Sequence, residues 1–301
     1  MEKTVLILGG SGRFGRHATI AFDRAGWTTR QFDRKHDDLW DAAWGAQVIV
    51  NAWNMPPGQW ATQALKAHEQ VMEIAKASGA TVILPGNVYN FGTSMPPLLG
   101  ADTPHRADTL YGQVRNDIEA TYRGSGARTI VLRAGDFLDT EASGNWFDRI
   151  MAATLPKGVL TYPGPTDRAH AWAFLPDLAR ASVALAEQRE ALPAFADIPY
   201  EGLTLTGEEM AASLSRVTGR EIKAKPMSWA PLRLLSPFWD VARYAVAMRY
   251  LWQVPHALDA SPLKQLLPDH VDSAADQALG AAIELDIDPN GAVPGKENVT
   301  V

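Results

Sequence analysis

The stretch Val5-Leu6-Ile7-Leu8-Gly9-Gly10-Ser11-Gly12-Arg13-Phe14-Gly15 decides the fold of this 301-residue chain. An apolar, strand-like run enters a glycine-rich turn, and a helical pattern leaves it. In such a turn the first glycine allows a sharp bend, the second lets the backbone approach a pyrophosphate, and the third lets the helix pack closely on the strand. Free N–H groups at a helix N-terminus favour bound phosphate. The stretch therefore predicts a dinucleotide-binding turn, with a ligand-free βα turn as the competing interpretation. The residues expected to line the phosphates are Gly9, Ser11, Gly12, Arg13, Phe14 and Gly15.

The next strand carries the signal for cofactor choice. The helix after the glycines ends at Gly26, and a second strand over Thr28 to Phe32 leads to Asp33. An acidic residue about 20 positions beyond the glycines accepts hydrogen bonds from the adenine ribose, so Asp33 favours NAD. Arg34 follows directly and can hold a 2′-phosphate, which leaves NADP open.

Strands and helices alternate through the first half of the chain. Strands are expected over 47–52, 81–84 and 129–132, and helices over 59–78 and 109–123. This alternation predicts an α/β fold, a doubly wound parallel Rossmann sheet with helices on both faces. The segment between Asp33 and Gln47 has room for one brief helix, so a strand common in larger sheets of this type is expected to be missing. We expect the dinucleotide-binding domain over 1–135, with 165–190 returning to it, and a smaller C-terminal substrate lobe and tail over 136–301.

Composition narrows the functional class. The chain is 46% hydrophobic and 21% charged, with net charge −6 and no cysteine. Without cysteine there are no disulfides, thiolate nucleophiles or cysteine-based metal sites. No long Lys/Arg block is present, so nucleic acid is not an expected partner. No His/Asp/Glu set shows metal-ligand spacing, so no metal is expected. The N-terminus enters a strand with no signal peptide before it, which predicts a cytoplasmic protein.

The sequence of the most apolar region, 229–252, does not indicate a membrane-spanning segment. Four charged residues interrupt it, and no uncharged run reaches the roughly 18 residues that a span requires. No membrane partner is therefore expected. The interrupting residues are Arg233, Asp240, Arg243 and Arg249.

An ordered set of motifs resembles a known family. Gly9-x-x-Gly12-x-x-Gly15 is followed by Asn51-Ala52-Trp53, by Val88-Tyr89-Asn90-Phe91-Gly92 and by Tyr111-Gly112-Gln113-Val114-Arg115. Val131-Leu132-Arg133 and the run 173–179 continue the series. Together they resemble the extended and atypical short-chain dehydrogenases/reductases, the family of NAD-dependent epimerases and dehydratases, over residues 3–190. The resemblance implies an NAD(P) cofactor beside Asn51, Ala52, Trp53 and Pro85, and a small-molecule substrate.

The family's catalytic pair is present in altered form. The family uses a Tyr and a Lys four residues apart, which places both on one helix face. Tyr111 matches the Tyr that exchanges a proton with the substrate oxygen, whereas the second position is Arg115, a cation able to hold the nicotinamide ribose. The family's Ser or Thr is replaced within Pro85-Gly86-Asn87, where Asn87 can donate a hydrogen bond instead. Simple packing of Tyr111 and Arg115 on the helix remains the alternative.

The expected substrate is a small, apolar carbonyl or alcohol. The Asn that nucleotide-sugar enzymes of the family place after this Arg is absent from 133–137, and aromatic residues are plentiful. Tyr89, Trp146 and Trp172 are the candidate substrate contacts. A sugar or nucleotide-sugar epimerase or dehydratase is an alternative, and so is a non-catalytic NAD(P)-binding sensor. His170 is expected to be structural, and Asp177 to lie near a helix N-cap.

A homodimer is expected through the helices at 59–78 and 109–123, which pair across a two-fold axis in the family. The helix that carries Leu65 and Met72 has more apolar positions than the core of the monomer needs in this interpretation.

Overall fold

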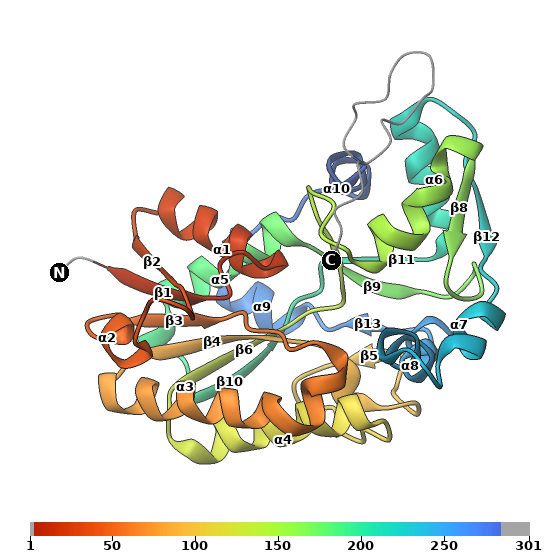
Figure 1. Ribbon diagram of the computed structural model, residues 1–301. Helices are drawn as coiled ribbons and strands as arrows, with labels where there is room; N and C mark the ends of the chain where they lie inside the picture. Colours follow the sequence, from red (N-terminus) through yellow and green to blue (C-terminus); the bar gives the residue numbers. More distant parts are fainter. Residues whose placement is uncertain (1–2, 284–301) are drawn as a thin grey trace.

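A six-stranded parallel sheet lies between two layers of helices in the computed structural model, which describes residues 3–283 (Figure 1). The order across the sheet is β10-β6-β4-β3-β1-β2, and every neighbouring pair is parallel. The predicted doubly wound sheet is therefore confirmed. Its strands are β1 (Thr4–Leu8), β2 (Thr28–Phe32), β3 (Val48–Asn51), β4 (Thr81–Gly86), β6 (Thr129–Arg133) and β10 (Phe195–Pro199).

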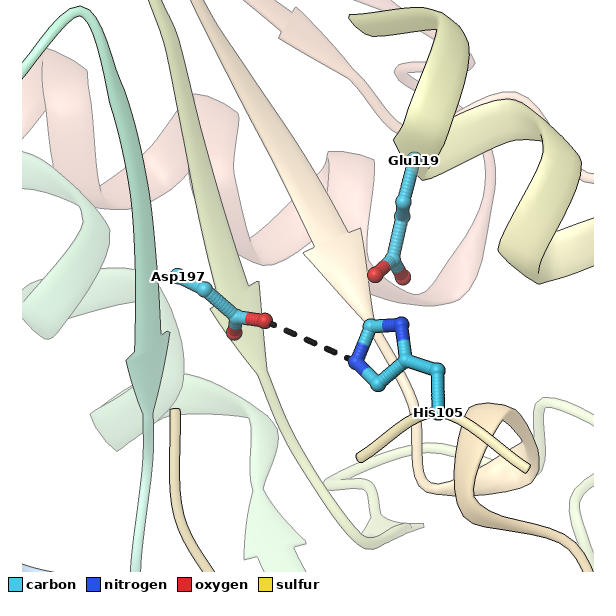
Figure 2. A group of neighbouring side chains, drawn as sticks. All are labelled: His105, Glu119 and Asp197. Atoms are coloured by element: carbon cyan, nitrogen blue, oxygen red, sulfur yellow. Dashed lines mark ion pairs between the residues drawn. The ribbon is translucent and has the colours of Figure 1, made fainter. Parts of the chain in front are cut away.

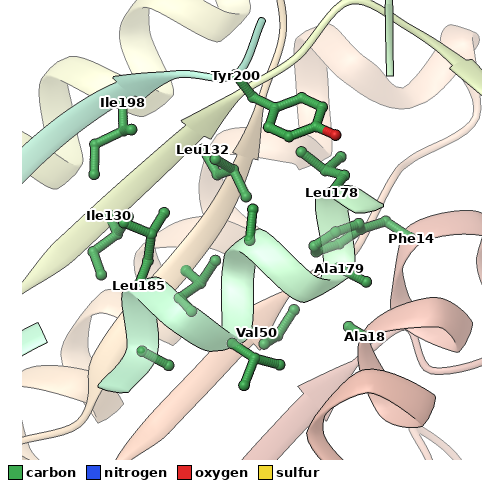
Figure 3. Close-up of a cluster of buried hydrophobic side chains, with 14 of the residues drawn as sticks. Phe14, Ala18, Val50, Ile130, Leu132, Leu178, Ala179, Leu185, Ile198 and Tyr200 are labelled. Atoms are coloured by element: carbon green, nitrogen blue, oxygen red, sulfur yellow. The ribbon is translucent and has the colours of Figure 1, made fainter. Parts of the chain in front are cut away.

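Both faces of the sheet are buried, because side chains alternate along each strand. In β1, Val5 and Ile7 enter one core and Leu6 and Leu8 enter the other. The first core packs against α1 (Arg13–Arg24) and α5 (Leu175–Glu187), and Figure 3 shows part of it. The second packs against α3 (Leu65–Ser78) and α4 (Leu110–Ser125).

The connection between β2 and β3 is short, as expected. It holds one brief helix, α2 (Leu39–Ala43), whose first turn is capped by the carboxylate of Asp38. No further strand lies beyond β2 in the described part of the chain, so β2 forms the edge of the sheet.

A smaller lobe is built from three further sheets, whose strands other than β5 follow β6, and the chain crosses between the two parts more than once. Helix α5 and strand β10 return to the large sheet, so its sixth strand comes from 195–199, beyond the segment 165–190. The lobe strands are β7 (Asp136–Leu138), β8 (Val159–Tyr162), β9 (His170–Phe174), β11 (Leu203–Leu205) and β12 (Lys223–Pro226), with β5 (Leu98–Leu99) paired to β13 (Ala257–Leu258). The helices are α6 (Gly207–Thr218), α7 (Ala230–Leu235), α8 (Asp240–Ala247), α9 (Ser261–Leu266) and α10 (Ala275–Ala282).

One helix start differs from the sequence expectation. The helix expected from residue 59 begins with irregular turns over 57–64 and becomes α-helical only at Leu65. Asp177 lies near a helix N-cap as expected, in the first turn of α5, which begins at Leu175. Asp177 is buried, and its carboxylate accepts hydrogen bonds from Arg180 and from the backbone N–H of Ser273. Among the described helices, none is long and apolar enough to cross a membrane.

Candidate functional site

The glycine turn has the geometry that its sequence predicts. Gly9 adopts φ +78°, a left-handed conformation that favours glycine, and the N–H of Gly12 donates to its carbonyl oxygen at 2.9 Å. A Cβ atom on Gly15 would collide with the same carbonyl. Only glycine at position 15 therefore lets α1 start this close to the end of β1.

The N-terminus of α1 is open. Gly12 is its N-cap, no side chain caps the first turn, and that turn contains no acidic residue. Ser11 and Gly12 are exposed, while Phe14 is buried in the core beneath them. Arg13 stands beside this end and its Nε donates to the carbonyl of Ser143 at 3.0 Å. Unsatisfied N–H groups, the helix dipole and a nearby cation all favour an anion here.

An aromatic and a cationic side chain lie next to the turn. A Cβ on Gly9 would meet the ring of Trp53 at 3.3 Å, and the guanidinium of Arg34 lies 4.7 Å from the centre of that ring. Asp33, at the end of the neighbouring strand, is exposed, and its carboxylate accepts the backbone N–H of Lys35 at 2.9 Å. Trp53 therefore holds the Arg34 guanidinium at this edge, while local turn bonds hold the Asp33 carboxylate.

Asn51 supports this edge from below. Its side chain is buried, and Nδ2 donates to the Tyr122 hydroxyl at 3.0 Å and lies 3.0 Å from Nδ1 of His68. Burial, and secondarily Arg115, lowers the pKa of His68 to about 3, so the imidazole is neutral. The carbonyl of Ala52 faces Gly9. The side chain of Asn51 thus anchors the loop between β3 and α3, a role the sequence did not indicate.

Tyr111 lies in the first turn of α4 and is almost fully buried. Its ring centre is 4.8 Å from that of Tyr244 and 5.7 Å from that of Trp60. Burial raises the pKa of Tyr111, with Arg243 lowering it and Asp240 raising it to smaller extents. Its hydroxyl makes no hydrogen bond to any residue that the structure describes. The result is a protonated phenol whose ring is packed among aromatic side chains.

Arg115 points to a different neighbour. Its Nη2 donates to the carbonyl of Pro85 at 2.6 Å, and its Nε is buried without a partner among residues 3–283. Burial lowers the pKa of Arg115, an effect that Glu119 opposes. The structure therefore places Tyr111 and Arg115 on one helix but does not bring their functional atoms together.

Asn87 lies between β4 and the short helical turn that follows it. Its Oδ1 accepts the backbone N–H of Tyr89 at 3.0 Å, and its carbonyl accepts Nη1 of Arg133 at 2.6 Å. The Nδ2 amide group is the part of the side chain left to donate to a ligand.

Four aromatic residues, Trp60, Tyr89, Tyr111 and Tyr244, form what we call the aromatic cluster. The hydroxyls of Tyr89 and Tyr244 lie 2.6 Å apart, and both rings are within 6.5 Å of Trp60. Burial raises the pKa of Tyr244 to about 12, although its bond to Tyr89 acts in the opposite direction. The sequence identified Tyr89 and Tyr111 but missed Trp60 and Tyr244, which come from separate segments of the chain.

The two predicted tryptophan contacts lie elsewhere. Trp172 is fully buried in the core of the smaller lobe, and Trp146 is half-buried against Trp229 and Trp252. His170 packs flat on Trp252 and its Nε2 lies 2.8 Å from a carboxylate oxygen of Asp136. These residues belong to the packing of the lobe and are not part of the aromatic cluster.

His105, Glu119 and Asp197 converge near the end of β6, as Figure 2 shows. Sequence spacing does not reveal this group, because its members come from three distant segments. The guanidinium of Arg133 already occupies the space between the carboxylates, with Nη2 at 2.7 Å from Glu119 and 2.6 Å from Asp197. Burial raises the pKa of Glu119, but the charges of Arg133 and Arg115 outweigh it and keep Glu119 ionised. The group is therefore a buried ion-pair network centred on a resident cation.

A second ion-pair group joins the smaller lobe to α1. The buried carboxylate of Asp139, just after β7, accepts Nη2 of Arg16 at 3.0 Å and lies 2.8 Å from Nε2 of His17. Burial raises the pKa of this carboxyl, but hydrogen bonds from His17 and Ser143 and the charge of Arg16 hold it at about 2. The glycine turn is thus fixed relative to the lobe.

Comparison with known proteins supports the fold. No protein-family model matches the sequence, and no curated protein matches it significantly. Solved structures do match: MoeE5 in complex with UDP-glucose and NAD is 16% identical, with a TM-score of 0.72 over 94% of this chain and 97% of that chain. L-threonine dehydrogenase from Phytophthora infestans is 17% identical, with a TM-score of 0.72 over 94% and 98%. Human epimerase family protein SDR39U1 with NADPH is 18% identical, with a TM-score of 0.70 over 94% and 99%.

The chain therefore has the fold of the extended short-chain dehydrogenases/reductases and NAD-dependent epimerases and dehydratases. The resemblance inferred from the ordered motifs is confirmed at the level of fold.

Proposed function

We propose that this protein is an NAD(P)-dependent oxidoreductase that acts on a small, apolar carbonyl compound or alcohol. The observation that carries the proposal is the open N-terminus of α1 above the glycine turn, with Arg13 beside it. The solved structures of this fold that hold NAD or NADPH support the cofactor part of the proposal.

The residues around the turn fit a dinucleotide. The phosphates would bind the free N–H groups near Gly12, and the adenosine would lie against Trp53 with Asp33 and Arg34 at its ribose. Toward the other end, the buried and unpartnered Nε of Arg115 is a donor that a ribose hydroxyl can satisfy. When bound, the cofactor supplies a hydride to a carbonyl carbon or accepts one from an alcohol.

Tyr111 is the proposed proton donor in carbonyl reduction. Its raised pKa keeps the phenol protonated at neutral pH, so it can give its proton to the substrate oxygen as the hydride reaches the carbon. The Nδ2 group of Asn87 is proposed to donate to the same oxygen. The surrounding aromatic cluster favours an apolar molecule, because desolvating the polar hydroxyls of a sugar against these rings is unfavourable.

Two alternatives stay open. MoeE5 binds UDP-glucose and NAD, and a UDP-galactose 4-epimerase shares the fold, so a sugar epimerase or dehydratase is as compatible with the likeness as a reductase. The separation of Arg115 from Tyr111 favours the second alternative, a cofactor-binding sensor without turnover.

Turnover separates these possibilities. A panel of aldehydes, ketones, alcohols and UDP-sugars is assayed with NADH, NADPH and their oxidised forms. We expect reduction of an apolar carbonyl, and a loss of about 10²–10⁴-fold in Tyr111→Phe. Tyr250→Phe is the matched control, because Tyr250 is a buried tyrosine of the same core. Turnover of a UDP-sugar alone would favour the epimerase, and tight cofactor binding without any turnover would favour the sensor.

A further inference from the structure

The hairpin formed by α7 and α8 carries a group of exposed apolar side chains that lie close together in the sequence. Five of the eight residues from 234 to 241 are large, apolar and exposed, and we call them the hairpin patch. Leu234 is 77% exposed and Phe238 is 89% exposed. Scattered apolar residues on a surface are ordinary, whereas a contiguous group marks a binding surface. The members of the patch are Leu234, Leu235, Phe238, Trp239 and Val241.

The hairpin is a folded element and its other side is packed. Ala242 and Ala245 of α8 are buried, and so is Trp229 just before α7. The guanidinium of Arg243 donates to the carbonyl of Pro237 in the connecting turn at 3.1 Å. Figure 1 shows α7 and α8 side by side, next to β5 and β13. The patch is thus presented by fixed backbone.

The charge around the hairpin is opposite in sign to that of the whole protein. Between residues 220 and 249 there are six Lys or Arg and two acidic residues, net +4, in a chain of net charge −6. Within the described residues, Lys225 and Arg233 make no ion pair, so their charges are available to a partner. The basic residues are Arg220, Lys223, Lys225, Arg233, Arg243 and Arg249.

We propose that the hairpin patch docks this protein on the surface of a lipid bilayer that contains anionic lipids. Exposed Trp, Phe and Leu side chains enter the interface between headgroups and acyl chains, and neighbouring Lys and Arg bind the anionic headgroups. No membrane partner is expected from the sequence, because no segment could span a bilayer. Docking at the bilayer surface requires no spanning segment, so that expectation does not exclude it. A second copy of this chain is a poorer occupant of the patch, because the Lys225 and Arg233 cations of the two copies, which make no ion pair within the described residues, would be brought together.

The hairpin is also part of the candidate site. Tyr244 of α8 contacts Tyr111 at 4.8 Å between ring centres, so docking places the aromatic cluster next to the lipid surface. If the proposed oxidoreductase function holds, its substrates are apolar carbonyl compounds or alcohols that partition into bilayers. The docking itself does not depend on that function, because binding to vesicles is measured without turnover.

Vesicle co-sedimentation of the full-length protein tests the docking. The probes are phosphatidylcholine vesicles with and without 30% phosphatidylglycerol (about 0.1 M salt, then 0.5 M). The test variant is Leu234→Ser with Phe238→Ser, and a second variant, Lys225→Gln with Arg233→Gln, removes only charge. Trp44→Ser is the matched control, because Trp44 is 75% exposed at the C-cap of α2, in a segment that contains Asp37, Asp38 and Asp41. Unchanged thermal unfolding verifies that each variant is folded.

We expect wild-type protein and Trp44→Ser to bind the anionic vesicles equally, with weaker binding at high salt. The apolar double variant should bind at least tenfold more weakly, and the charge variant should lose its preference for phosphatidylglycerol. The proposal is overturned if wild-type protein binds neither kind of vesicle, or if the apolar double variant binds as well as wild type. It is also overturned if light scattering shows a wild-type dimer that the apolar double variant converts to a monomer, because a second copy then covers the patch.

Discussion

The ionisation of Tyr111 gives a quantitative test of its proposed role. In the structure, burial is the largest influence on this phenol and raises its pKa above the usual 10.0. The Arg115 guanidinium, which stands where the family has the Lys that lowers the Tyr pKa, is directed to the carbonyl of Pro85. We therefore predict that Tyr111 titrates above pH 10 in the free protein.

The magnitude follows from the titration curve. A phenol with a pKa of at least 10 is ionised to no more than about one part in 10³ at pH 7. Alcohol oxidation needs the phenolate as base, so its rate should rise about tenfold per pH unit between pH 7 and 9. Carbonyl reduction needs the protonated phenol, so over the same range its rate should show no loss from this group.

A difference titration measures the pKa without a known substrate. Tyrosinate absorbance is recorded against pH for wild type and for Tyr111→Phe, and the difference isolates one phenol. Tyr250→Phe serves as the control for loss of a buried tyrosine. A midpoint for Tyr111 below pH 9, or alcohol oxidation already on its plateau at pH 7, would refute the reasoning and show that a cation acts on the phenol.

Three further predictions concern cofactor choice, acid stability and assembly. Arg34→Ala should weaken NADPH binding more than NADH binding in calorimetry, because the guanidinium held over Trp53 can contact a 2′-phosphate; equal losses would assign it no such contact. Asp139→Asn should lower the free energy of unfolding by about 1–2 kcal/mol at pH 7. The pKa of Asp139 is lowered to about 2 in the folded protein, so the ionised carboxylate stabilises the fold above pH 4 and this stabilisation disappears as the pH falls toward 2. If urea unfolding gave parallel profiles of stability against pH for the variant and wild type, this prediction would be contradicted. If the helices 59–78 and 109–123 pair in a homodimer, light scattering should give the mass of a dimer at micromolar concentration. A monomer mass would exclude this dimer.

The expected dimer has weaker support in the structure than in the sequence. Met72 is 3% exposed in the second core, and Leu65 is partly buried against it. Both apolar positions are therefore used within the monomer. The outward residues of α3 are charged or polar, among them Lys66, Glu69 and Glu73.

The sequence predicts the fold well because local rules determine it. The glycines of the first turn are required by backbone geometry alone, and the alternating burial of β1 follows from strand periodicity. The segment between Asp33 and Gln47 is so short that its length alone predicts one brief helix and no additional strand. Helix starts are less predictable: the turns over 57–64 begin at Pro57, directly after Pro56, and Trp60 within them packs against aromatic rings from distant segments.

The site is less predictable because side-chain direction depends on distant neighbours. The four-residue spacing of Tyr111 and Arg115 places both on one helix face, but Tyr244, more than 130 positions away, takes the contact with Tyr111. Asn51 belongs to a motif of the cofactor edge, yet His68 and Tyr122 bind its side chain. Arg133, identified only as part of a motif, proves to be the centre of a buried ion-pair network.

Binding of the cofactor at the glycine turn is the central claim, and calorimetry with Gly12→Asp tests it most directly. Gly12 is the N-cap of α1 with φ −77° and ψ 169°, a conformation that other residues adopt. Asp is a favoured N-cap residue, although its Cβ would meet the carbonyl oxygen of Gly9 at 3.1 Å, so thermal unfolding is measured to verify that the variant is folded. Its carboxylate would satisfy the free N–H groups and repel a pyrophosphate. We predict that wild-type protein binds NADH or NADPH and that Gly12→Asp weakens this binding more than about tenfold, 1.4 kcal/mol. Folded wild-type protein that binds neither nucleotide, or a Gly12→Asp variant with unchanged affinity, would contradict the account.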